Sequence, residues 1–333
     1  MATIYEVSKL AGVSLATVSR VVNKNLSVSE KTRQKVLKAM EQLDYKPNLV
    51  AKSLASNRSD CVGVLVSEFY GSFYGGIMSG VESVLRKADK HIVVTAGHNE
   101  EQREKDDIEF LISRNCDALI LHVEAVSDEY LINLCQGKIP VIILNRHIPK
   151  IADRCISLDN ELGGYLATKH VLEKGHTQVA YISGPKRKAD AQERLVGHKR
   201  ALQEFNVEFD QARVYEGDYL QIGGSAGIKH FLENDIEFTA AICANDEMAT
   251  GAIATARENN LDVPNDVSIF GFDNVVFASY TYPTLSTINY PVQDMGKMAA
   301  KAILKQVYKI DMPDVQNVFE PEVVERNSVK SLN

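Results

Sequence analysis

The sequence lacks several features that mark other classes of protein. No apolar run approaches the roughly 18–20 residues that a membrane span needs. The N-terminal segment MATIYEVSKL lacks the apolar stretch of a signal peptide, so we expect a cytoplasmic protein. The five cysteines are odd in number, scattered and never CxxC-spaced. This argues against a disulfide framework or a zinc site and favours reduced, buried thiols.

Familiar catalytic and nucleotide-binding motifs are missing as well. The sequence contains no G-x-G-x-x-G, no P-loop and no HExxH. Residues 223–227 match the G-x-S-x-G nucleophile elbow, but we expect this segment to open a helix. The one later histidine, His230, follows with no Asp or Glu in between. We interpret the match as accidental, expect no enzyme, and assign no catalytic residue, cofactor or metal ligand.

Length and charge divide the chain. Its 333 residues exceed the about 250–300 at which a single core stops growing. Residues 1–60 carry seven lysines and three arginines against five acidic residues, a formal charge of +5. The rest carries 27 basic and 39 acidic residues, a formal charge of −12. A basic head on an acidic body suggests that only the head meets a polyanion, although a solvated surface bias would give the same balance.

The first 46 residues have the pattern of three short helices. Thr3-Ile4-Tyr5-Glu6 fits a capping box that starts a helix at its second residue. Gly12 supplies a turn, Ser14 can cap a second helix from Leu15 to about Val22, and Ser29 can cap a third. The apolar positions expected to form a small core are Val7, Leu10, Ala11, Val18, Val21, Val22, Val36, Leu37, Met40 and Leu43.

A helix, a tight turn and a second helix with an outward arginine form a helix-turn-helix motif, which places the second helix in the major groove. Arg20 can donate two hydrogen bonds to guanine, worth about 1–3 kcal/mol of discrimination. Leu15 and Ala16 suit a thymine methyl group or close docking. The remaining residues expected at the DNA, mainly through phosphates, are Ser14, Thr17, Ser19 and Asn23. A bundle used only for protein contacts is the alternative, and the basic charge favours DNA.

Residues 3–23, TIYEVSKLAGVSLATVSRVVN, resemble the signature of the lactose/galactose repressor family of bacterial transcription regulators. The resemblance continues through KPNLVAKSLAS at 46–56 and through CANDEMATGA, VPNDVSIFGFDN and YPTLSTINYP, so it covers nearly the whole chain. The segments RCISLDNELGGYLATKHVLEKGHTQVAYISG and NVFEPEVVERNSV resemble galactose-operon repressors in particular. The resemblance implies a homodimer that binds a near-palindromic double-stranded operator under the control of a small sugar.

The segment that joins head and body is predicted to fold only on DNA. Pro47 ends the preceding helix, and Asn48 can cap a helix of about eight residues. Isolated helices need roughly 12–15 residues to persist in water. The resemblance implies that two such hinge helices pair in the minor groove, where Ala51 and Lys52 contact DNA and Leu54 is the wedge between central base pairs. A plain tether whose Leu54 rests on the body is the alternative.

From Cys61 onward, short β-rich runs alternate with helical stretches; the runs are VGVLV, IVV, ALILH, VIIL, VAYIS, AAICA and VSIFGF. This alternation predicts βαβ units and parallel sheets. The predicted fold is a small all-α helix-turn-helix head plus an α/β body of two lobes that resembles periplasmic sugar-binding proteins. The expected parts are the head (1–46), the hinge and linker (47–60) and the effector-binding and dimerisation domain (61–333). Its lobe 1 is expected at about 61–160 and 292–322, and its lobe 2 at about 161–291.

Ligands of open parallel sheets bind at the carboxyl ends of the strands. The polar residues expected there are His122, Asn145, Asn245 and Asp273. Arg194 lies where the family places an arginine that grips the ligand, and Phe69, Phe73 and Tyr219 suit the C–H face of a sugar ring. The family often has an Asn-Pro step before its first-lobe phenylalanine, and this chain has Gly71-Ser72 instead.

Structural roles compete with each of these assignments. Asp246 is predicted to cap the following helix, Asn145 also suits a turn, and His122 and the aromatic residues also suit the core. We expect a repressor, bound to the nucleoid when on its operator and with no membrane partner, whose effector is galactose or a related monosaccharide. The alternatives are a catabolite-control regulator that is co-activated by a phosphorylated carrier protein, and a stand-alone sugar-binding protein.

Overall fold

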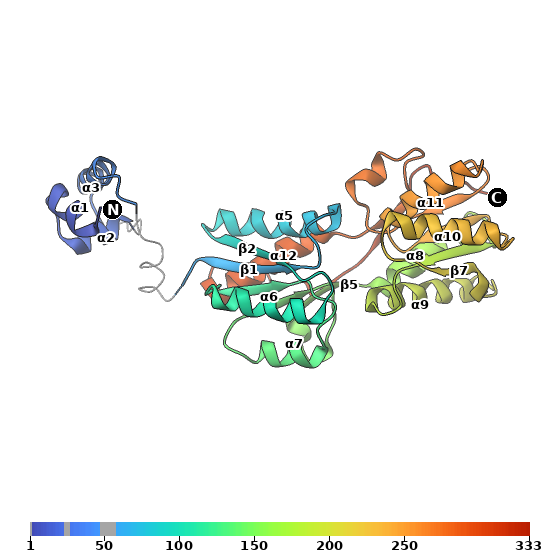
Figure 1. Ribbon diagram of the computed structural model, residues 1–333, viewed down its shortest axis with the longest axis horizontal. Helices are drawn as coiled ribbons and strands as arrows, with labels where there is room; N and C mark the ends of the chain where they lie inside the picture. The colour runs from blue at the N-terminus through green and yellow to red at the C-terminus, as the bar shows by residue number, and fades with distance from the viewer. Residues whose placement is uncertain (1, 23–26, 47–57) are drawn as a thin grey trace. The chain divides into compact units, whose positions relative to one another are not determined.

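The computed structural model describes residues 2–22, 27–46 and 58–333. The chain divides into two compact units, Met1–Asp60 and Cys61–Asn333, here called the head and the body (Figure 1). The predicted fold class, an all-α helix-turn-helix head with an α/β body of parallel sheets, is confirmed.

The head contains three helices, α1 (Ile4–Ala11), α2 (Leu15–Val22) and α3 (Glu30–Gln42). The predicted capping box is present, because the Thr3 side chain accepts from the Glu6 backbone while the Glu6 carboxylate accepts from the Thr3 backbone N–H at 2.7 Å. Gly12 ends α1 in the left-handed region at φ 66°, which glycine adopts without a Cβ clash. The hydroxyls of Ser14 and Ser29 accept from backbone N–H groups three residues on, as expected of helix caps.

The core of the head is smaller than the sequence suggested. Its buried residues are Val7, Ala11, Val18, Val21, Val36 and Ala39. Leu10 and Leu37 were predicted to be buried, but 51% and 44% of their surfaces are exposed. Leu37 lies about 100° around the helix from Val36, so only one of the two can face the other helices. Ala39, which the prediction omitted, takes the inward position.

Lobe 1 of the body is built on a six-stranded sheet in which every neighbouring pair is parallel. In spatial order its strands are β11 (Val318–Phe319), β5 (Cys155–Leu158), β4 (Val141–Leu144), β3 (Ala118–Leu121), β1 (Cys61–Val66) and β2 (His91–Ala96). One face is covered by α5 (Ser72–Lys87) and α12 (Val292–Tyr308), and the other by α6 (Glu101–Ser113) and α7 (Asp128–Cys135) (Figure 1). Because helices cover both faces, the central strands are buried throughout.

Lobe 2 repeats this plan on a smaller sheet of four parallel strands. Their spatial order is β7 (Val214–Glu216), β6 (Val179–Ser183), β8 (Ala240–Cys243) and β9 (Ser268–Phe270). Helices α8 (Asn160–Glu173) and α9 (Ala189–Glu204) pack on one face, and α10 (Gln221–Glu233) and α11 (Asp246–Glu258) on the other. The G-x-S-x-G segment lies inside α10, so it is no strand-to-helix elbow. Three 3₁₀ turns complete the body: η1 (Pro149–Arg154), η2 (Gln211–Arg213) and η3 (Val276–Ser279).

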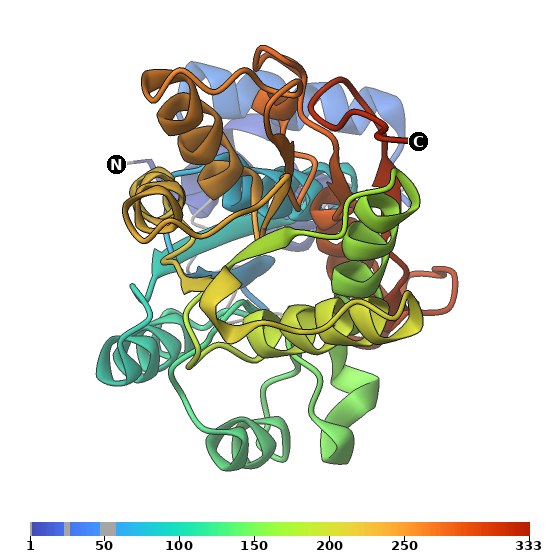
Figure 2. The same cartoon turned by 90° about the vertical axis from the view of Figure 1, so that its right-hand side faces the viewer.

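The chain crosses between the lobes three times. It passes from β5 to α8, from β10 (Thr287–Asn289) to α12, and from β11 to β12 (Glu322–Val324), where β10 and β12 form an antiparallel pair. The residues after β12 return to lobe 2, where the carbonyl of Ser328 accepts from the backbone of Ile269 at 2.9 Å. Figure 2 shows this C-terminal end beside α8. The sequence had placed crossings near 160 and 290 and assigned residues 323–333 to neither lobe.

Among the described residues, no helix has both the length and the apolar character that a membrane span requires. In the same part of the chain, no group of three or more His, Cys, Asp or Glu side chains is arranged to hold a metal ion.

Candidate functional site

The outward face of α2 carries the residues expected to read DNA. Ser14, Leu15, Ala16 and Arg20 are exposed, and Thr17 and Ser19 are half-buried. The side chains of the first turn of α2 are therefore small and partly apolar. Its last turn carries the cationic side chain of Arg20, which is not part of the core. This arrangement suits close approach to base edges. The other residues expected at the DNA lie outside the described residues: Asn23, Asn48, Ala51, Lys52 and Leu54.

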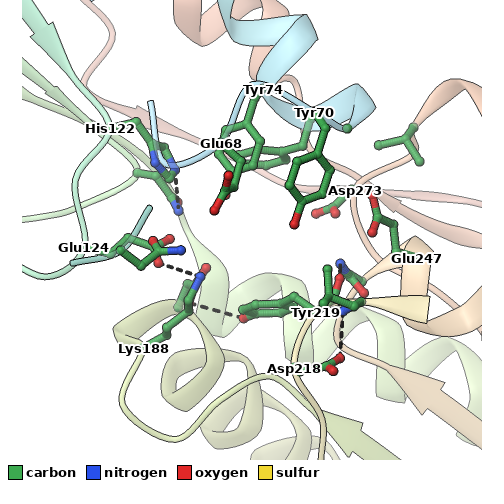
Figure 3. A pocket seen from close by; sticks show the side chains of 18 of the residues that line it. Glu68, Tyr70, Tyr74, His122, Glu124, Lys188, Asp218, Tyr219, Glu247 and Asp273 are labelled. Atoms are coloured by element: carbon green, nitrogen blue, oxygen red, sulfur yellow. Dashed lines mark hydrogen bonds and ion pairs between the residues drawn. The ribbon is translucent and has the colours of Figure 1, made fainter. Parts of the chain in front are cut away.

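A cavity of about 210 Å³ lies between the lobes at the carboxyl ends of their strands (Figure 3). Residues of both lobes line it. Seven of the eight residues expected at the effector meet here: Phe73, His122, Asn145, Arg194, Tyr219, Asn245 and Asp273. The eighth, Phe69, does not line the cavity and is 57% exposed. It precedes the turn at Gly71, and α5 then directs Phe73 inward instead.

Arg194 is the central cation of the cavity. It extends from α9, is 2% exposed, and donates from Nε to Asn160 Oδ1 at 2.9 Å and from a terminal nitrogen to the Ala244 carbonyl at 2.5 Å. Its guanidinium carbon lies 3.7 Å from the centre of the Phe272 ring, a stacking contact that holds the plane of the group. The side chain is therefore fixed in place before any ligand arrives.

Two carboxylates flank this guanidinium. Asp190 and Asp273 each approach a terminal nitrogen of Arg194 at 3.9 Å. Burial alone would lower the pKa of Arg194, but these carboxylates and the Tyr219 hydroxyl raise it, so the group stays charged. Burial raises the pKa of Asp273 well above its ordinary value, against the opposing effect of Arg194. The cluster offers closely spaced donors and acceptors, which suit the vicinal hydroxyls of a sugar.

The wall that lobe 1 contributes contains a buried histidine and an amide. His122 is 2% exposed, and its Nδ1 lies 3.1 Å from the Ser67 hydroxyl. Burial lowers the pKa of His122, so the imidazole is neutral at physiological pH. Asn145 follows β4 in the left-handed region at φ 59° and accepts a hydrogen bond from the Tyr290 hydroxyl. Both residues thus have structural partners and also line the cavity.

Aromatic rings cover one side of the cavity. Phe73 packs edge-on against Tyr74, His122 and Tyr290, with ring centres 5.3, 5.9 and 5.2 Å apart. On the opposite lobe, the Tyr219 hydroxyl donates to Asp190 at 3.2 Å. Apolar ring faces with a few fixed polar groups are the usual lining of small-molecule sites.

The start of α11 corrects one prediction. Asn245, and not Asp246, is its N-cap: the Asn245 carbonyl oxygen accepts from the Met248 backbone at 2.9 Å. Asp246 is the first helical residue, is fully buried, and accepts from the Thr287 hydroxyl at 2.6 Å and the Val275 backbone at 2.9 Å. The Asn245 amide nitrogen donates to the Tyr219 carbonyl at 2.8 Å. Asn245 therefore joins two segments of the cavity wall.

Several cavity residues were missed by the sequence analysis: Glu68, Tyr70, Tyr74, Asn99, Glu124, Lys188, Asp190, Asp218 and Glu247. Most of them follow a strand by two to seven residues. The rule that ligands meet strand ends had been applied only to the first polar residue after some strands. Extending it to the whole loop after every strand would have found the charged ones.

In the described part of the cavity wall, no Ser, Thr or Cys side chain is present to act as a nucleophile. Several of the groups that are present, among them Arg194, Asp190 and Tyr219, are held by hydrogen bonds or ion pairs to their neighbours. Their closely spaced donors and acceptors suit recognition of a small polar molecule.

Comparison with known proteins agrees with this geometry. Residues 3–48 match the model of the bacterial regulatory proteins of the lacI family, and residues 168–329 match a periplasmic binding protein-like domain. The chain is 37% identical over 331 residues to the HTH-type transcriptional regulator GalR of Escherichia coli (strain K12), covering 99% of this chain and 96% of that protein.

Two solved structures have the same architecture. A lac repressor dimer bound to operator and the anti-inducer ONPF superposes with a TM-score of 0.87 at 29% identity, over 99% of both chains. A complex of the transcriptional regulator CelR with cellobiose gives a TM-score of 0.72 at 29% identity, over 98% of this chain and 100% of that chain. Head, body and overall sequence therefore agree: the chain belongs to the lacI family of bacterial regulatory proteins.

Proposed function

We propose that this protein is a homodimeric transcriptional repressor, located in the cytoplasm and on the nucleoid, whose affinity for a near-palindromic operator is set by a small sugar. The observation that carries the effector part is the buried cluster of Arg194, Asp190 and Asp273 in a cavity shared by two lobes. A charged group held between fixed acceptors is suited to hydroxyl recognition. Galactose is the first candidate, because the chain resembles galactose-operon repressors.

The lobes give the sugar a way to act on the head. Three chain crossings join them, and a ligand that contacts both walls favours the closed arrangement. In a homodimer, closure moves the first lobes relative to each other and separates the two segments that lead to the heads. Coupling of this kind is typically about 1–3 kcal/mol, or 5- to 150-fold in affinity.

The DNA part is tested with a duplex selected from a randomised pool, measured by fluorescence anisotropy. We expect specific binding that falls steeply with salt concentration, because the head neutralises phosphates. Calorimetry against a panel of neutral monosaccharides, galactose first, identifies the effector. A protein that binds no duplex specifically, or whose operator affinity no sugar alters, is not the proposed repressor.

The proposal includes the segment at 47–57, which lies outside the described residues. The family resemblance assigns Leu54 there as the minor-groove wedge. Leu54→Ser should then weaken operator binding strongly and leave sugar affinity unchanged. If the wild type and Leu54→Ser bound operator with equal affinity, Leu54 would not be a minor-groove wedge, and the segment would be a plain tether.

A further inference from the structure

The charges around the cavity are strongly unbalanced. Six carboxyl groups line it, and only two cationic side chains do so among the described residues. The cations are Lys188 and Arg194, both from lobe 2. Burial raises the pKa of the Tyr70 hydroxyl, and the charges of Glu68, Glu247 and Asp218, which line the cavity with it (Figure 3), raise it further. An anion in the cavity is therefore surrounded by more negative than positive groups.

Both cations already have anionic partners, so neither presents an uncompensated positive charge to such an anion. Arg194 already donates to Asn160 and Ala244 and lies between two carboxylates. Lys188 Nζ lies 2.5 Å from Glu124 Oε2, with only 11% of the lysine side chain and 17% of the glutamate side chain exposed. This pair joins lobe 2 to lobe 1 across the cavity, as Figure 3 shows. Water screens a pair this well enclosed only weakly.

The loop that carries Glu124 is fixed by its own contacts. The buried carboxylate of Glu104 accepts from the backbone N–H groups of Glu124, Ala125 and Val126 at 2.8–3.1 Å. Arg146 donates to the Val126 carbonyl at 2.8 Å. The backbone of Glu124 is thus positioned independently of Lys188. The glutamate is held at the cavity wall as a built feature and is not a mobile surface charge that meets a lysine by chance.

We propose that the cavity selects uncharged sugars against sugar phosphates and sugar acids, and that Glu124 enforces this selection by occupying Lys188 across the cleft. The inference rests on the proposed function, because it names the charge class of the same effector. To bind Lys188, a phosphate or carboxylate would have to displace Glu124 and leave that carboxylate unpaired among the other acidic groups. A neutral sugar needs no such exchange.

Inorganic phosphate is a probe that does not depend on which sugar is the effector. Its binding to the full-length protein is measured by calorimetry and ³¹P NMR. The wild type should show no saturable phosphate binding. Glu124→Gln frees Lys188, so its dissociation constant for phosphate should lie at least about tenfold below the weakest binding that the assay can detect. Glu247→Gln is the matched control, because it removes one carboxylate from the same cavity and Glu247 pairs with neither cation. Glu247→Gln should not increase phosphate affinity. The double variant Glu124→Gln/Lys188→Gln should lose the phosphate affinity that Glu124→Gln gains.

A second arm compares galactose with galacturonate and galactose 6-phosphate in the same variants. In the wild type the neutral sugar should bind more tightly than either anionic sugar. Glu124→Gln should reduce the ratio of neutral-sugar affinity to anionic-sugar affinity about tenfold or more. Saturable phosphate binding by the wild type, equal gains in Glu124→Gln and Glu247→Gln, or an anionic sugar that outcompetes its neutral parent would overturn the proposal. If no sugar binds while the phosphate arm behaves as predicted, the proposed effector class fails and the role of Glu124 stands.

Discussion

Replacing Arg194 by methionine removes the central charge of the cavity and keeps much of the apolar volume of the side chain. The substitution deletes hydrogen bonds to Asn160 and Ala244 and leaves the carboxylates of Asp190 and Asp273 without their shared cation. Removing one partner of a buried ion pair typically costs about 3–5 kcal/mol, because the other charge stays buried and unpaired. We expect a loss of that size in the unfolding free energy of the body, together with loss of effector binding.

Arg200→Met is the matched control for this experiment. Arg200 lies on the same helix α9, but its side chain is 46% exposed; it pairs with Glu161, itself 43% exposed, and lies over the Tyr165 ring at 4.3 Å. Exposed pairs are worth about 0–1 kcal/mol. In a body of this size, each kcal/mol shifts the melting temperature by about 2–4 °C. Thermal and urea unfolding should therefore show a decrease of about 6–20 °C for Arg194→Met and at most about 4 °C for Arg200→Met.

A second substitution identifies the cause. In the Arg194→Met background, Asp273→Asn removes one of the unpaired carboxylates and should recover part of the lost stability. If the two arginine variants lost equal stability, or if Asp273→Asn recovered none, the electrostatic account of this cluster would be refuted.

Three further predictions follow from other parts of the chain. Burial raises the pKa of Asp246 from 3.8 to about 7, so the folded state binds more protons than the unfolded state in that interval. The unfolding free energy of the wild type should therefore fall from pH 4 to pH 7 relative to Asp246→Asn, and parallel pH profiles of the two in urea would contradict this. Arg20→Ala should weaken operator binding about 5- to 150-fold, measured by anisotropy, with no change in melting temperature. Gly164→Ala should destabilise lobe 2 by about 1–3 kcal/mol or more, because its Cβ would clash with the Arg194 carbonyl of the adjacent helix, whereas Gly75→Ala meets no atom and should not destabilise the fold in the same melts.

Local sequence rules predicted the parts of the fold that depend on near neighbours. The caps at Thr3, Ser14 and Ser29 and the turn at Gly12 were assigned correctly, because the groups that satisfy them lie within a few residues. Asp246 was misassigned as a cap because Asn and Asp both suit that position. The partner that fixes its actual role, Thr287, is 41 residues away.

Contacts between residues far apart in sequence also explain which cavity residues the sequence did not predict. His122, Asn145 and Asp273 each follow a strand that the hydrophobic pattern identifies, so the strand-end rule places them together. Glu124 and Lys188 belong to different lobes, and only the packing of one lobe against the other brings them to 2.5 Å. Phe69 and Phe73 have the same residue type within one loop, and only the backbone turn at Gly71 decides which of them faces inward.

The central claim is that sugar binding in the cavity controls operator binding by the head. The most direct test measures the sugar affinity of the full-length protein in the absence and in the presence of the selected operator duplex. If the cavity controls the head, saturating operator should change sugar affinity by the same factor, about 5- to 150-fold, by which saturating sugar changes operator affinity. Identical sugar affinity with and without operator, in a protein that binds both, would contradict it.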